Sequence, residues 1–167
     1  MTVASSGSAT VTLPTDEQIL VTREFDAPKH LVYKAWTTPE LVKRWWHAKR
    51  GEMTVAEIDL RVGGKWRYVM VADNGFEVGF HGEYLEVVPN ELIVSTEVYE
   101  GLPEGVSDEE GGTLNTATFA EANGRTKVTL LVQAASKVSR DAIIDSGMED
   151  GLQDALDLLE GIASSLA

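Results

Sequence analysis

The segment from Glu24 to Trp46 constrains the fold of this chain more than any other part of the sequence. It begins with strand-like alternation and then contains Pro28 and Pro39, each at a position typical of a first helical residue, which loses nothing by lacking an N–H group. Thr38 is a suitable N-cap for the second helix. Both predicted helices are short and carry one apolar face, and short helices are marginal alone in water. They must therefore pack against a larger element of the same domain.

On both sides of these helices the sequence alternates strands with turns. Strands are predicted at residues 18–25, 54–62, 65–72, 76–88, 91–99, 113–121 and 126–134, with a further short strand within 8–13. Gly63-Gly64 is interpreted as a two-residue hairpin turn between two of them. Because strands joined by short turns pair in antiparallel fashion, we expect one curved antiparallel sheet.

The chain is predicted to end in one long amphipathic helix that begins near Ser139 as its N-cap. Its apolar stripe consists of Ile144, Met148, Leu152, Ala155, Leu159 and Ile162. Gly147 and Gly151 are four residues apart near this stripe, although glycine inside a helix costs about 1 kcal/mol relative to alanine. We interpret the two glycines either as points of tight packing or as room left for a ligand.

This order of elements predicts an α+β fold of the helix-grip type. A curved antiparallel sheet of about six to seven strands would wrap around the long C-terminal helix, with the two short helices supporting one end. Residues 18–167 are expected to form one domain and residues 1–17 an N-terminal extension with one short strand. A length of 167 residues is enough for a single large core.

Composition excludes several classes of function. The net charge of −13 argues against binding nucleic acid, which requires Lys and Arg at the phosphates. No apolar run is long enough to span a membrane, and the first residues lack the pattern of a secretory signal, so we expect a cytoplasmic protein. The absence of cysteine excludes disulfides, thiolate catalysis and cysteine-based metal sites. We predict neither a cofactor nor a metal site. The sequence is compatible with a monomer and with a homodimer, and it allows a protein partner.

Charge is unevenly distributed along the chain. Nine of the 14 basic residues lie between Lys29 and Arg67, whereas residues 97–112 carry six acids and no base. One interpretation is that both are ordinary solvated faces. The other is a basic rim that attracts an anionic ligand.

Four stretches of sequence together resemble one known family. They are FDAPKHLVYKAWTTPELVKRWW, RVGGKWRYVM, FHGEYLEVVP and SGMEDG. The combination is similar to the bacterial branch of the activator of heat-shock protein 90 ATPase homologue-like family, within the START and birch-pollen-allergen (SRPBCC) superfamily, and it covers residues 18–163. The resemblance implies a helix-grip fold with an apolar ligand pocket between the sheet and the long helix.

We expect a protein that binds an apolar or aromatic small molecule without catalysis. The wider superfamily implies an alternative, an enzyme of the cyclase, aromatase or hydrolase type that uses the same cavity. The eukaryotic namesake of the family implies a third, a co-chaperone-like regulator of a heat-shock protein ATPase. Acid and base side chains that point into the cavity would favour the enzyme over the binding protein.

Few residues are suited to catalysis. The chain has three histidines, none at a metal-binding spacing, and no serine-elbow motif. His81 and Glu83 lie two residues apart on one predicted strand, so they share a face and are candidates for proton transfer, with His47 a further candidate. We expect His81 and Glu83 to be an exposed surface pair instead.

The aromatic residues indicate the binding site. Alternation places Trp66, Tyr68 and Met70 toward the long helix, and places Lys65 and Arg67 toward solvent. A sheet covered by one helix encloses apolar space suited to a small molecule. The residues predicted to line it are Trp46, Trp66, Tyr68, Met70, Phe80, Thr96, Met148 and Leu152.

Overall fold

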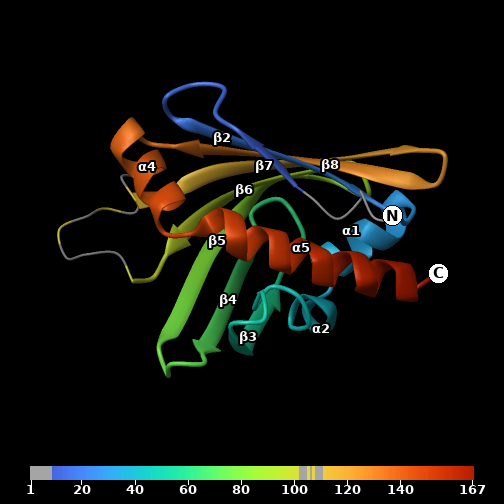
Figure 1. Ribbon diagram of the computed structural model, residues 1–167, viewed down its shortest axis with the longest axis horizontal. Coiled ribbons are helices and arrows are strands. Elements are labelled where there is room, and N and C mark those ends of the chain that lie inside the picture. Colours follow the sequence, from blue (N-terminus) through green and yellow to red (C-terminus); the bar gives the residue numbers. More distant parts are fainter. Residues whose placement is uncertain (1–8, 102–104, 106, 108–110) are drawn as a thin grey trace.

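The computed structural model describes residues 9–101, 105, 107 and 111–167, and these form a curved antiparallel sheet with a helix across its concave face (Figure 1). The strand order is β1-β2-β8-β7-β6-β5-β4-β3. The strands are β1 Thr10–Thr12, β2 Gln18–Phe25, β3 Gly51–Ile58, β4 Lys65–Ala72, β5 Glu77–Val88, β6 Leu92–Tyr99, β7 Thr113–Ala122 and β8 Arg125–Ala134. The sheet has eight strands rather than the expected six to seven, because the short β1 also pairs with β2. Residues 1–8 of the expected N-terminal extension lie outside the described part.

The two short helices follow β2 as predicted, and the second begins at Pro39 after the N-cap Thr38 as expected, whereas Pro28 is the N-cap of the first helix and not its first residue. Helix α1 spans Lys29–Thr37 with Pro28 as its N-cap, and α2 spans only Pro39–Val42. The chain then continues as turns through residue 49, where Ala48 and Lys49 adopt left-handed backbone angles, with φ of 54° and 63°.

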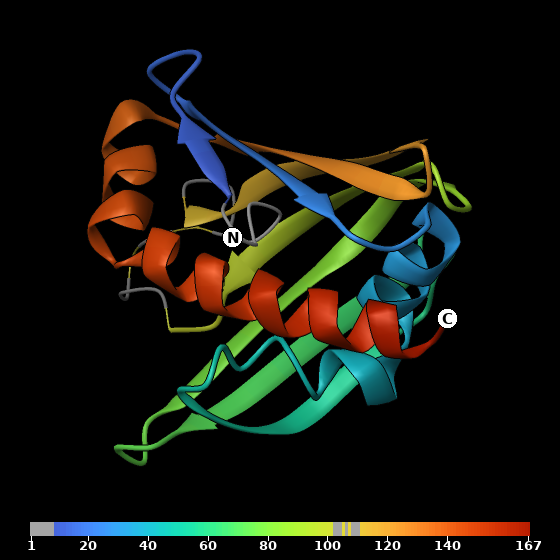
Figure 2. The same cartoon turned by 45° about the vertical axis from the view of Figure 1, so that its right-hand side comes forward.

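The C-terminal region was predicted as one helix, and this prediction was wrong. The chain forms α4 (Lys137–Asp145) and α5 (Met148–Ser165), which run in different directions (Figure 2). Gly147 lies between them with a φ of 86°, a left-handed conformation that ends a right-handed helix and that glycine adopts without strain. The N-cap of α4 is Ser136, whose side chain accepts a hydrogen bond from the backbone N–H of Ser139.

The interpretation of Gly63-Gly64 as a two-residue turn was also wrong. Strand β3 ends at Ile58, and the connection to β4 runs from residue 59 to residue 64. The backbone N–H of Gly63 donates to the Tyr84 carbonyl, and the Tyr84 N–H donates to the Gly64 carbonyl. The end of this loop therefore lies along β5 and extends the sheet beyond β4.

The main core lies between the sheet and α5. Leu159 is completely buried, as are Ile19 and Phe25 on the facing strand β2. Buried Arg23, on the same strand, forms ion pairs of 3.0 Å with Asp157 and 3.2 Å with Glu160 of α5. These contacts fix the C-terminal half of α5 to one edge of the sheet.

Candidate functional site

A group of aromatic side chains covers the concave face of strands β4 and β5. Tyr68 and Phe80 are cross-strand partners, so both side chains project from the same face. The Trp46 ring packs edge-on against both, with centroid separations of 5.5 Å to Tyr68 and 5.6 Å to Phe80. Trp66 continues the group at 4.8 Å from Tyr68, and Tyr99 continues it at 5.1 Å from Phe80. The rings form one continuous aromatic surface from the turn after α2 to β6.

Trp66 is held in place by a glycine on the neighbouring strand. The Trp66 Nε1–H group donates a 3.2 Å hydrogen bond to the Thr96 carbonyl, and the side chain is 7% exposed. Gly82 is the cross-strand partner of Trp66, and a Cβ atom at Gly82 would lie 2.6 Å from the indole nitrogen. The absence of a side chain at Gly82 therefore makes room for the Trp66 ring. The prediction that Trp66 is buried is confirmed, and Lys65, its neighbour on the other face, is exposed.

The concave face is not completely covered. Tyr68 and Phe80 are half-buried, and so is Leu130, which projects from the same face of β8 as buried Val132. On α5, Leu152 is half-buried. A Cβ at Gly151 would meet no atom within 4 Å, so tight packing does not explain that glycine. The accessible part of the concave face, bordered by Trp46, Tyr68, Phe80 and Leu152, is called the concave site below.

A carboxyl group lies on the same face of the sheet. Tyr84 is the partner of Ser95, so Ser95 and Glu97 of β6 share the concave face with Tyr84. Asn115, the partner of Ser95 on β7, donates a 3.2 Å hydrogen bond from Nδ2 to Glu97 Oε1. Burial raises the pKa of Glu97, and the Asn115 hydrogen bond partly opposes this effect. Glu97 is thus an acidic group that holds a proton more readily than an exposed glutamate does.

The charge of this carboxyl group acts on Tyr68, and Tyr68 and Tyr33 each influence Tyr84. Burial raises the pKa of Tyr68 well above its ordinary value, with smaller effects from Tyr84 and from the charge of Glu97. The pKa of Tyr84 is raised by burial first and then by Tyr33. Tyr33, on α1, packs its ring edge-on against Phe119 with a centroid separation of 5.4 Å. Tyr68 gives the otherwise apolar concave site a polar group, whereas Tyr33 and Tyr84 are buried.

Sequence reasoning missed Glu97 and Tyr33. Thr96 was predicted to line the pocket, which assigned its face of β6 to the inside, whereas the structure turns Glu97 inward. Tyr33 was not among the residues predicted to line the site. Its burial follows from contact with β7 and carries no sequence signal of its own.

The predicted proton-transfer residues lie on the opposite, convex face. His81 Nδ1 is 2.9 Å from Glu100 Oε2, and Glu100 also accepts two hydrogen bonds from Arg67. The hydrogen bonds from Arg67, followed by that from His81, lower the pKa of Glu100 to about 2. Glu83 pairs with Lys65 instead, at 3.1 Å. His81 and Glu83 share a face as expected, but each has another partner.

His47 lies in the turns after α2 and is half-buried. Its Nδ1 atom accepts a 3.0 Å hydrogen bond from the backbone N–H of Lys49. This contact stabilises the left-handed turn and assigns the remaining ring proton of a neutral imidazole to Nε2. A catalytic role for His47 stays a prediction.

Among the predicted lining residues, Thr96 occupies a different place from the others. Thr96 pairs with Leu114, and Leu114 pairs with Gln133, so these side chains share the convex face. A hollow of about 440 Å³ lies where β6 and β8 end and β7 begins, and its lining combines residues of both faces of the sheet. It is lined by Thr96, Glu97, Val98, Gly112, Thr113, Leu114, Gln133, Ala134 and Ala135. The other predicted residues belong to the core or pack against it; they are Trp46, Trp66, Tyr68, Met70, Phe80, Met148 and Leu152.

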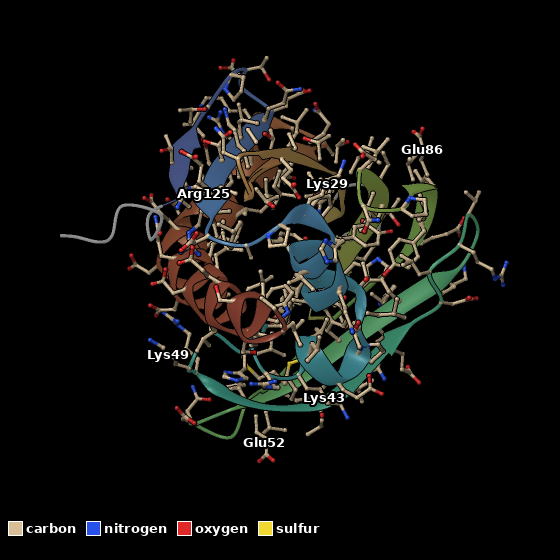
Figure 3. The ribbon with its side chains drawn as sticks, turned by 90° about the vertical axis from the view of Figure 1, so that its right-hand side faces the viewer. Lys29, Lys43, Lys49, Glu52, Glu86 and Arg125 are labelled. Carbon is tan, nitrogen blue, oxygen red and sulfur yellow. The ribbon has the colours of Figure 1, made fainter. Side chains whose placement is uncertain are left out.

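The basic residues between Lys29 and Arg67 do not gather at one rim. Lys29 pairs with Glu91, and Arg50 pairs with Asp154 on α5 at 2.9 Å. Figure 3 shows Lys29, Lys43 and Lys49 at separate places around this end of the molecule. This arrangement favours solvated, partly paired surface charges over a basic rim. Within the described residues, no cluster of three or more His, Asp or Glu side chains is suited to a metal ion, and no helix is long and apolar enough to cross a membrane.

A curved, open antiparallel sheet that holds a C-terminal helix on its concave face defines the helix-grip class of the SRPBCC superfamily. The family model described as Activator of Hsp90 ATPase homolog 1-like protein matches residues 26–164. The chain therefore belongs to this family. A search of curated proteins found no match.

Solved bacterial structures share the fold over nearly the whole chain. A crystal structure from Rhodobacter sphaeroides has 23% identity and a TM-score of 0.85, covering 96% of this chain and 100% of that chain. A protein from Chromobacterium violaceum has 27% identity and a TM-score of 0.76, covering 89% and 98%. The AHSA1-like protein from Aeromonas hydrophila has 21% identity and a TM-score of 0.63, covering 88% and 93%.

Proposed function

We propose that this protein binds an apolar or aromatic small molecule at the concave site and does not transform it. The observation that carries the proposal is the continuous aromatic surface of Trp46, Tyr68 and Phe80, whose rings contact one another and yet remain half-buried. Soluble proteins rarely leave contiguous aromatic surface accessible without a use for it. A planar ligand placed there would gain apolar burial and edge-to-face ring contacts, each worth about 0.5–1.5 kcal/mol.

An enzyme is the second candidate function. It is favoured by Glu97, a carboxyl group with a raised pKa on the same face as the hydroxyl groups of Tyr68 and Tyr84. A carboxyl group whose pKa is raised is better suited to donate a proton than an exposed glutamate, and a cyclase, aromatase or hydrolase requires proton transfer. Glu97 replaces His81 and Glu83 as the candidate, because those two side chains lie on the convex face. A co-chaperone role would rest on the family description alone and is the third candidate.

A fluorescent apolar probe tests the binding proposal. N-phenyl-1-naphthylamine is uncharged and fluoresces strongly in apolar surroundings, so its titration reports an accessible apolar site. We expect saturable binding that weakens about tenfold or more in Phe80→Ala, because one ring of the aromatic surface is removed. Phe76→Ala is the matched control, since Phe76 is 72% exposed at the turn between β4 and β5. Equal losses in both variants, or no saturable binding by the wild type, would refute the proposal.

A further inference from the structure

We propose that the ligand of the concave site is uncharged and carries a hydroxyl or carbonyl oxygen that hydrogen-bonds to the Tyr33 hydroxyl group. Tyr33 is then the residue that selects oxygen-bearing aromatic molecules over plain hydrocarbons and over anions. The inference rests on the proposed function and adds the chemical class of the ligand.

The Tyr33 hydroxyl group is buried without a hydrogen-bond partner among the described residues. The Tyr33 side chain is only 7% exposed, and its ring is fixed against Phe119 on the concave face of β7. A buried hydroxyl group that has given up water and gained no partner is unfavourable, and such groups in folded proteins call for an explanation. A ligand oxygen that supplies the missing hydrogen bond is that explanation.

The ring of Tyr33 packs against the concave face of β7, and Tyr33 acts electrostatically on a residue of the neighbouring strands. Tyr33 raises the pKa of Tyr84, which projects from the concave face of β5 opposite Ser95. Tyr84 in turn influences Tyr68, which belongs to the aromatic surface. The unpaired hydroxyl group thus belongs to a tyrosine that packs on the concave face of the sheet, and electrostatic effects link it through Tyr84 to Tyr68 of the aromatic surface.

The charges on this face disfavour an anionic ligand. Among the described strand residues of the concave face, Arg23 is the one cation, and it is already paired with Asp157 and Glu160. Glu97 adds a negative charge on the same face when it is ionised, and the whole chain has a net charge of −13. A carboxylate or sulfonate ligand would meet repulsion and no free cation, whereas a neutral hydroxyl or carbonyl group would not.

Three probes of one shape separate these chemistries at neutral pH. Naphthalene carries no polar group, 2-naphthol carries a neutral hydroxyl group, and 2-naphthoate carries a negative charge. Their affinities can be measured by displacement of N-phenyl-1-naphthylamine from the wild type, Tyr33→Phe and Tyr99→Phe. Tyr99 is the matched control, because it is an exposed tyrosine at the edge of the aromatic surface.

We expect the wild type to bind 2-naphthol about tenfold more tightly than naphthalene, a difference of about 1.4 kcal/mol, and to bind 2-naphthoate most weakly. Tyr33→Phe should abolish the preference for 2-naphthol and leave naphthalene binding unchanged, whereas Tyr99→Phe should keep the preference. Tyr33→Phe should fold normally, which a circular-dichroism melt checks, because it removes a hydroxyl group with no hydrogen bond among the described residues.

The outcomes distinguish this inference from the proposed function. Equal wild-type affinity for naphthalene and 2-naphthol, an unchanged preference in Tyr33→Phe, or tightest binding of 2-naphthoate would each overturn the inference while leaving the concave site as a binding site. Failure of all three probes and of N-phenyl-1-naphthylamine to bind would overturn the proposed function and the inference together.

Discussion

Replacement of Gly82 by alanine tests whether the aromatic surface depends on the absence of one side chain. A Cβ atom at this position would lie 1.8 Å from the Thr96 carbonyl oxygen and 2.6 Å from Trp66 Nε1. A methyl carbon cannot lie this close to an oxygen or nitrogen atom to which it is not bonded. The carbonyl belongs to the backbone of β6, so either the two strands separate or the indole ring moves and loses its hydrogen bond.

The cost follows from these two effects. Overpacking in a well-packed core costs about 1–3 kcal/mol. Leaving the buried indole N–H group of Trp66 without a partner costs about 1–3 kcal/mol more. We therefore expect Gly82→Ala to lower the free energy of unfolding by about 2–6 kcal/mol, a large part of the roughly 5–15 kcal/mol typical of a domain. The melting temperature should fall by roughly 2–4 °C for each kcal/mol in a chain of this size.

Urea denaturation followed by tryptophan fluorescence measures this change, and Gly79→Ala in the same strand is the control. A Cβ at Gly79 would meet Glu100 Oε1 at 2.5 Å, but this atom is the far end of a flexible side chain that can move away. The control should cost less than about 1 kcal/mol, because the ion pairs of Glu100 are at the surface. If Gly82→Ala were no more destabilising than Gly79→Ala, the account of how Trp66 is positioned would be refuted.

Two further predictions concern pH and the helix break. Because the folded state raises the pKa of Glu97 above its ordinary value of 4.5, it binds more protons than the unfolded state, and stability falls as pH rises through that window. Glu97→Gln should remove this fall, and its free energy of unfolding at neutral pH should gain about 1.4 kcal/mol for each pH unit by which the pKa of Glu97 is raised. Urea denaturation of both proteins from acid to neutral pH measures the change. Parallel pH profiles of the two proteins would contradict the prediction. Gly147→Ala should lower the free energy of unfolding by about 1–2 kcal/mol, because it places a side chain at a φ of 86°. Gly161→Ala inside α5 should instead raise it by up to about 1 kcal/mol, since a Cβ there meets no atom within 4 Å. Thermal melts that ranked the two variants in the opposite order would contradict the explanation of the break between α4 and α5.

The sequence by itself determined the order and type of nearly all elements. The predicted bounds of the strands at 18–25 and 65–72 agree with β2 and β4 to the residue. Alternation of side chains and the turn residues at strand ends are local properties, so they can be recognised without knowing what the strand packs against. The burial of Trp66 and the exposure of Lys65 followed from the same alternation.

Only the tertiary structure decided which polar groups reach the concave site. Alternation gives two faces of β6 and does not say which is inside, and the apolar face of Val94 and Val98 proved to be the convex one. The break at Gly147 was likewise hidden, because the apolar stripe continues across it while the backbone does not. Tyr33, Tyr84 and Glu97 lie on α1, β5 and β6, and in the folded chain Tyr33 acts on Tyr84 while Glu97 acts on Tyr68. Their function depends on that proximity, and proximity between distant segments is a property of the folded chain alone.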